Sequence, residues 1–203
     1  MIWVHMPLSE SEENKMVEYV TPKKSEITRL WHNIWNRCYN RAWQEKYNKK
    51  YIGHTMSDDI LNNRYETFYP FVQENFYRID GETIDLDHDI LKHDNTVYAL
   101  DYMIFAPHSI NVLYEQLEVG KTNITYNSKN HTYTVKVFAD GEYITAKDLQ
   151  TYKDALDTYC NIKYMIILEK AEQYKDKIPD KLYNAMINTD VKAINQKYYD
   201  NAA

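Results

Sequence analysis

The run Ile84-Asp85-Leu86-Asp87-His88-Asp89-Ile90 alternates apolar and polar side chains, and this period of two predicts a half-buried β-strand. The turn residues Asp94-Asn95 follow it. A second short strand is expected at one of two places, Val97–Tyr98 or Met103–Phe105, and Pro107 then suits the start of a helix. The order strand, loop, strand, helix therefore predicts a small ββα unit.

Helices are expected before this unit. Apolar residues recur every three or four positions from Ile27 to Cys38, which predicts one amphipathic helix from Ser25 to about Tyr47. Two shorter helices are expected, one after Ser57 and one that has Pro70 in its first turn. Residues 1–22 are expected to form a leader segment before the first helix.

The pattern after Gly120 changes again. Strands are expected near 122–126, 132–138 and 142–146, because turn residues at 127–130 and 140–141 separate them. Thr151 and Asp154 form a capping-box pattern, which predicts a helix to about Tyr174, and a last short helix is expected at 180–187. The fold class is therefore expected to be α+β: an N-terminal helical segment, a ββα unit, and a three-stranded antiparallel sheet packed on a long helix. The expected divisions are 1–22, 23–118 and 119–203.

Composition limits the class of protein. The chain has 203 residues, of which 44% are hydrophobic and 27% charged, as is usual for globular proteins. No apolar run reaches the roughly 20 residues of a membrane helix, and the start of the chain lacks the pattern of a signal peptide. Cys38 and Cys160 both fall in helical patterns and are expected as buried thiols. A cytoplasmic protein with no membrane partner is expected.

Charge is unevenly distributed along the chain. The net charge is −6, and residues 65–120 hold two Lys or Arg against eleven Asp or Glu, while residues 23–64 hold nine against four. The basic segment, which contains Arg37 and Arg41, offers only a weak face for nucleic acid. The acidic block is either a solvated face or a mimic of nucleic-acid phosphates that occupies a partner's basic groove.

The Asp-His-Asp run is the candidate for chemistry. Divalent-metal cleavage of a phosphodiester needs an oxygen ligand for the cation, a neutral imidazole as base, and a further ligand from a facing element. Asp87 would be the ligand with Asp89 alongside, His88 the base, and Asn111 the second ligand, around Mg²⁺ or Mn²⁺. The alternative is a solvated polar strand face, with Asn111 only forming hydrogen bonds in its helix.

Several motifs carry a resemblance to a known family. They are Trp31-x-x-Ile34-x-x-Arg37-Cys38-Tyr39, Leu86-Asp87-x-Asp89-Ile90-Leu91, Asn95-x-x-Tyr98 and Phe105-x-Pro107-x-x-Ile110-Asn111, followed by Tyr133-x-Val135-x-Val137 and Thr151-x-x-Asp154-Ala155-x-x-x-Tyr159. This pattern resembles HNH endonuclease-like proteins of phages that infect Gram-positive bacteria. In that family an ethylene-response-factor-type (ERF) DNA-binding domain follows the nuclease core. The resemblance spans about residues 28–194 and implies an HNH-like ββα-metal core followed by an ERF-like sheet.

The chain departs from that family at three points. One is the stretch Tyr51-Ile-Gly-His-Thr, which has no Trp where the family often has a Gly and a Trp between its first two helices. An HNH core carries a structural Asn between strand and helix, and the corresponding place is about Tyr102. The ERF-like sheet, which would bind DNA through cations, keeps mainly Lys129 and Lys136.

These departures leave two functions open. The first is a catalytically degenerate protein without a cofactor, which inhibits a host defence nuclease such as a CRISPR effector through Asp85, Asp89 and Asp94. The alternative is an active, nicking or homing HNH endonuclease on double-stranded DNA that uses Mg²⁺ or Mn²⁺.

Overall fold

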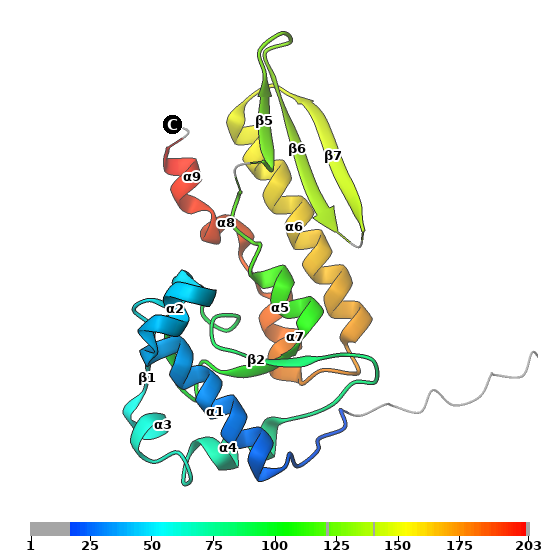
Figure 1. Ribbon diagram of the computed structural model, residues 1–203. Coiled ribbons are helices and arrows are strands. Elements are labelled where there is room, and N and C mark those ends of the chain that lie inside the picture. Colours follow the sequence, from blue (N-terminus) through cyan, green and yellow to red (C-terminus); the bar gives the residue numbers. More distant parts are fainter. Residues whose placement is uncertain (1–16, 121, 140, 202–203) are drawn as a thin grey trace, which may run out of the picture.

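The structure is a computed structural model that describes residues 17–120, 122–139 and 141–201. Most of the expected leader lies outside the described residues. Two parts with short sheets are joined by a linker, whose described residues are 115–120, 122 and 123. A long helix spans the upper part (Figure 1). The expected α+β class is confirmed. None of the described helices has both the length and the apolar character needed to cross a bilayer.

The first helix is shorter than expected. α1 (Lys24–Tyr39) buries Ile27, Trp31, Ile34 and Cys38, which confirms the apolar stripe. The expectation of one helix to Tyr47 was wrong, because the chain leaves helical geometry at Asn40 and α2 (Arg41–Tyr47) begins there. The Asn40 side chain accepts a hydrogen bond from the backbone N of Trp43 at 3.1 Å and so caps the new helix.

A parallel strand pair that the local pattern does not predict follows these helices. After the 3-10 turn η1 (Lys49–Tyr51), β1 (Thr55–Met56) pairs in parallel with β3 (Val97–Tyr98). Between these strands lie α3 (Asp58–Asn62) and α4 (Phe68–Asn75), close to the two short helices expected. The pair links the N-terminal helices to the loop after the Asp-His-Asp run.

Strand, strand and helix follow in the expected order. β2 (Ile84–Asp87) pairs antiparallel with β4 (Ile104–Pro107), and α5 (His108–Tyr114) begins directly after β4 and contacts both strands. Both alternative places for the second strand are strands, but only β4 pairs with β2, whereas β3 pairs with β1. β2 ends at Asp87, so His88 and Asp89 lie in the loop.

The C-terminal sheet and its helix confirm the expectation. β5 (Ile124–Asn127), β6 (Thr132–Ala139) and β7 (Glu142–Leu149) form an antiparallel sheet in that order. One face of this sheet packs on α6 (Tyr152–Tyr174) (Figure 1). The 23 residues of this helix span about 34 Å. The capping box is present, since the backbone N of Asp154 donates to Thr151 Oγ1 at 3.0 Å and the backbone N of Thr151 donates to Asp154 Oδ2 at 3.2 Å.

The C-terminal helices return along α6 and hold the linker. They are α7 (Asp180–Ile187), α8 (Val191–Ile194) and α9 (Gln196–Asp200). The fully buried Asn195 accepts from the backbone N of Val119 at 2.8 Å and donates to the carbonyl of Leu117 at 3.0 Å. Tyr159 donates to the carbonyl of Glu118 at 2.9 Å. Buried apolar residues of both parts belong to one hydrophobic core.

Candidate functional site

A hollow of about 240 Å³ lies where β2, the loop after it and α5 meet. We call it the acidic hollow. It is lined by Arg37, Lys50, Tyr51, Asp85, Asp87, His88, Asp89, His108, Asn111 and Glu115. The structure thus brings together Asp87, His88, Asp89 and Asn111, the four residues expected to form the metal and catalytic site.

Asp85 joins the strand to the helix. Its Oδ2 lies 2.7 Å from His108 Nδ1 and accepts a hydrogen bond from Asn111 Nδ2 at 3.0 Å. His108 and Asn111 are three residues apart on α5, so both side chains lie on one helix face above the strand. Asn111 is therefore oriented by Asp85, a residue that was expected to bind a partner.

Asp87 and Asp89 form a tight turn at the end of β2. Asp87 Oδ1 accepts hydrogen bonds from the backbone N of Asp89 at 2.8 Å and of Ile90 at 2.7 Å. Burial, and then the neighbouring charge of Asp89, raises the pKa of Asp87 well above its usual range. Burial also raises the pKa of Asp89. Burial and mutual repulsion therefore disfavour the ionised form of both carboxyl groups, and a bound cation would favour it again.

His88 completes this group, but its side chain is buried. Ligand atoms of Asp87, His88 and Asp89 all lie within 4.8 Å of one another. The His88 side chain is only 5% exposed, and its Nε2 is buried without a hydrogen-bond partner among the residues that the structure describes. Burial, together with His54, Arg37 and Lys50, lowers the pKa of His88 to about 3. The imidazole is therefore neutral at physiological pH and a weak base.

Asn95 holds the loop that carries His88. Its Nδ2 donates to the carbonyl of His88 at 2.6 Å and to the carbonyl of Val97 at 2.7 Å. The side chain is 6% exposed. Sequence reasoning sought a structural asparagine near Tyr102, a half-buried residue whose ring lies 4.8 Å from Lys92 Nζ. The turn signal at Asp94-Asn95 marked the position but not this role.

The residues expected to bind DNA do not share one surface. Half-buried Arg37 faces the acidic hollow and donates to the Tyr98 hydroxyl at 3.2 Å, whereas exposed Arg41 pairs with Glu45 at 2.7 Å. Exposed Lys129 and Lys136 lie on the turn after β5 and on β6. Lys136 and Lys147 are the only cations in the three strands, and Glu142 and Asp148 balance them. The sheet therefore offers the phosphate backbone of duplex DNA little attraction.

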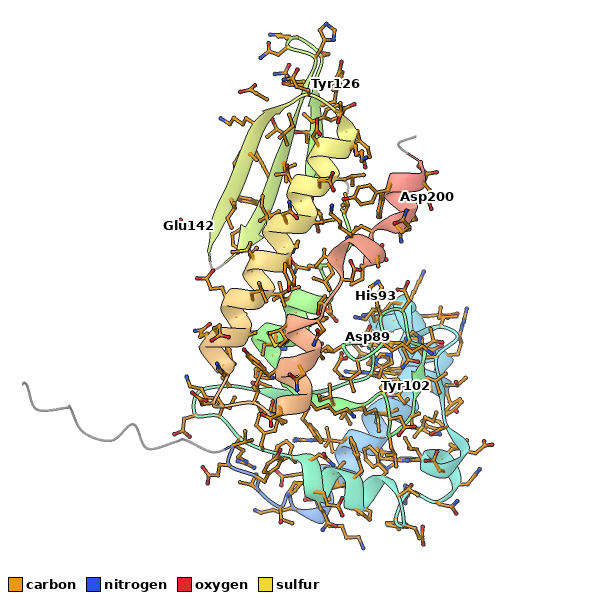
Figure 2. All side chains as sticks on the ribbon, turned by 180° about the vertical axis from the view of Figure 1, so that it is seen from behind. Asp89, His93, Tyr102, Tyr126, Glu142 and Asp200 are labelled. Carbon is orange, nitrogen blue, oxygen red and sulfur yellow. The ribbon has the colours of Figure 1, made fainter. Side chains whose placement is uncertain are left out.

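The acidic residues expected to bind a partner differ in exposure. The side chain of Asp94 is 80% exposed, and its Oδ1 lies 3.4 Å from His93 Nε2, while Asp85 and Asp89 are half-buried. Asp89 and His93 lie close to Tyr102 and far from Tyr126 in the hairpin of the sheet (Figure 2). The group His93, Asp94 and Glu118 also has ligand atoms within 4.8 Å of one another.

The donor atoms of the acidic hollow suit a divalent cation. Two carboxylates and a neutral imidazole at this spacing match the ligands that Mn²⁺ accepts, and the partnerless His88 Nε2 leaves that ring's bonding incomplete. Comparisons with protein-family models, with curated proteins and with solved structures found no significant match to this chain.

Proposed function

We propose that this chain is a binding protein built on an HNH-like strand–strand–helix unit, that it no longer cleaves DNA, and that it inhibits a nucleic-acid-handling protein. The observation that carries the proposal is the burial of His88. A general base must reach the water that attacks the phosphate, and a ring that is 5% exposed with a pKa of about 3 is poorly suited to this task.

The charge distribution supports a protein partner over DNA. Asp94 and Asp101 are exposed in the segment that follows the Asp-His-Asp run, and the sheet that would bind DNA has no surplus of cations within its three strands. An acidic surface repels phosphates and attracts the basic groove of a nucleic-acid-binding protein. The resemblance to phage proteins suggests a bacterial defence nuclease, such as a CRISPR effector, as the owner of that groove.

The test is cleavage of a target plasmid by an RNA-guided CRISPR nuclease in the presence of this protein. We expect inhibition that falls when Asp94→Asn and Asp101→Asn are combined. Asn keeps the positive φ of 57° at Asp94 at little cost. Glu142→Gln, an exposed acid on β7, is the matched control and should inhibit like the unmodified chain. Equal inhibition by the double variant would count against the acidic surface.

The alternative is a divalent-metal DNA endonuclease. The observation in its favour is the spacing of Asp87, His88 and Asp89 within 4.8 Å. Asp87 and Asp89 would hold Mg²⁺ or Mn²⁺, with Asn111 as a further ligand, and His88 would take the proton of the attacking water. The bound cation would supply Lewis-acid activation of the phosphate.

Supercoiled plasmid separates the two functions. Incubation with Mn²⁺ or Mg²⁺ should leave it intact if cleavage is lost. Nicking that His88→Ala abolishes, while Glu142→Gln preserves it, would overturn the binding proposal and establish the endonuclease.

A further inference from the structure

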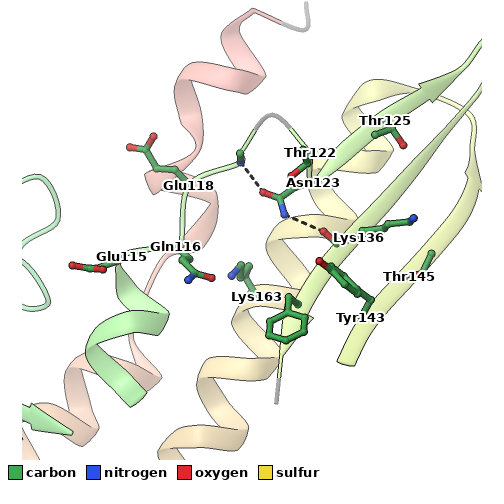
Figure 3. A pocket seen from close by; sticks show the side chains of 12 residues that line it. Glu115, Gln116, Glu118, Thr122, Asn123, Thr125, Lys136, Tyr143, Thr145 and Lys163 are labelled. Carbon is green, nitrogen blue, oxygen red and sulfur yellow. Dashed lines mark hydrogen bonds between the residues drawn. The ribbon is translucent and has the colours of Figure 1, made fainter. Parts of the chain in front are cut away.

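A second and larger hollow lies between the linker, α6 and the free edge of β6. It measures about 750 Å³, within the size range of ligand pockets. We call it the sheet-edge hollow. It forms because β5 pairs only with residues 132–135 of β6, which leaves the edge beyond Lys136 uncovered. The opposite wall consists of described linker residues, which are Glu115, Gln116, Glu118, Gly120, Thr122 and Asn123 (Figure 3).

Lys163 is the unusual residue of this hollow. It lies on the packed face of α6 and is 3% exposed, yet no hydrogen bond or ion pair reaches its Nζ within the described part of the chain. Its side chain extends between Gln116 of the linker and Tyr143 of the sheet (Figure 3). Burial lowers its pKa. An unpaired ammonium with so little access to water is destabilising, so its retention at the wall of a hollow points to a ligand that supplies the missing charge.

The acidic residues around the hollow do not fill that role. Glu115 pairs with Lys50 at 2.5 Å, and Glu118 pairs with Lys197 at 2.6 Å. Both cations lie outside the hollow. Lys136 lines the hollow from the sheet, and its side chain forms no ion pair in the parts of the chain that the structure describes. Two ammonium groups therefore lack an anion, which matches the double charge of a phosphomonoester near neutral pH.

The rest of the lining suits a ring and oxygen atoms. Phe138 and Tyr143 are 53% and 68% exposed, and their rings meet edge to face with centroids 5.1 Å apart. Exposed aromatic rings beside a cation are a common platform for a nucleobase. The hydroxyls of Thr122, Thr125 and Thr145 add hydrogen-bonding groups.

We propose that the sheet-edge hollow binds a phosphomonoester that carries an aromatic ring, of the size of a nucleoside 5′-monophosphate. Lys163 binds the phosphate, Lys136 attracts it from the outer face of the sheet at the rim of the hollow, and Phe138 with Tyr143 contacts the ring. The ligand is a free nucleotide or the 5′-phosphate end of a nucleic acid, which share this chemistry. The site is independent of the function proposed above, since Glu115 alone lines both hollows.

The test is calorimetric titration of the full chain with thymidine 5′-monophosphate, thymidine, and 5′-phosphorylated tetrathymidylate. We expect binding of both phosphorylated probes and none of thymidine. Tighter binding of the tetranucleotide would identify a nucleic-acid end as the source, and equal binding a free nucleotide. Lys163→Gln should weaken binding by about tenfold or more. Lys153→Gln, an exposed lysine on the same helix, should have no effect.

Two further variants keep the proposal testable if Lys163→Gln does not fold. Lys136→Gln and Tyr143→Ala change exposed side chains, so both should fold, and each should weaken binding of thymidine 5′-monophosphate several-fold. The proposal is overturned if the unmodified chain does not bind thymidine 5′-monophosphate at millimolar concentration, if thymidine binds equally well, or if folded Lys163→Gln and Lys136→Gln bind it unchanged.

Discussion

The imidazole of His88 lies almost parallel to the phenol ring of Tyr98, with 4.0 Å between the ring centroids and 12° between the ring planes. Tyr98 is fully buried, so this stack packs the His88 ring against the hydrophobic core at the wall of the acidic hollow. The ring behaves as a core side chain that keeps one unsatisfied nitrogen.

His88→Phe tests this relationship. Phenylalanine keeps the stack on Tyr98 and removes the partnerless Nε2, whose burial costs about 1–3 kcal/mol. We expect the variant to raise the free energy of unfolding in EDTA, measured by urea denaturation. His88→Ala, which leaves a cavity, should lower it by about 2–4 kcal/mol. A His88→Phe protein less stable than His88→Ala would contradict the stack as the main role of this ring.

Asn95 should be as important for stability as a core residue. Asn95→Asp replaces an amide that donates at 2.6 and 2.7 Å with a carboxylate that faces two carbonyl oxygens. We expect a loss of about 3 kcal/mol or more in thermal or urea unfolding, and a smaller loss for Asn95→Ala. Asp94→Asn, one residue earlier and exposed, is the control and should change stability little.

Cation binding should stabilise the protein through the carboxylates of the acidic hollow. A ligand that binds only the folded state raises the melting temperature, so Mn²⁺ should raise it for the unmodified chain. Asp89→Asn removes one donor and relieves the repulsion that raises the pKa of Asp87, so it should be more stable than the parent in EDTA and gain less from Mn²⁺. Differential scanning fluorimetry in EDTA and in Mn²⁺ measures both effects. A parent melting temperature that Mn²⁺ leaves unchanged would refute the cation site.

Lys163 should make stability depend on pH in the alkaline range. Burial lowers its pKa in the folded state below the ordinary 10.5, so the unfolded chain binds more protons between these two values. Stability is therefore lost as pH falls through the folded pKa. Lys163→Met removes this loss and should be more stable than the parent at pH 7, with an advantage that disappears above pH 10.5. Urea unfolding at pH 7 and pH 10.5 measures this; an equal advantage at both values would refute it.

Sequence patterns predicted the helices and strands that depend on interactions between residues close together in the chain. Thr151 and Asp154 predicted the start of α6, and the alternation around Leu86 predicted β2. The break at Asn40 was missed because the apolar pattern continues from α1 towards α2, whereas the cap depends on one side chain bonding to Trp43. The β1–β3 pair joins residues about 40 positions apart, and no local pattern encodes such a contact.

The sequence indicated which residues gather at the candidate site but not the contacts that they form there. Asp87, His88, Asp89 and Asn111 share one hollow, as the sequence indicated. The burial of His88 depends on Tyr98, which β3 brings from ten residues further along the chain, and the orientation of Asn111 depends on Asp85. Lys163 was overlooked because it sits within an apolar helix face, where its lack of a partner becomes evident only in three dimensions.

The hydrogen bonds of Asn195 to Val119 and Leu117 determine when the joint between the two parts can form during synthesis. The linker leaves the ribosome about 75 residues before the asparagine that satisfies its buried backbone groups. Folding during translation proceeds from the N-terminus, so the helical part and the sheet can each form while the joint between them is still open. The joint between the two parts can close only after Asn195 has left the exit tunnel.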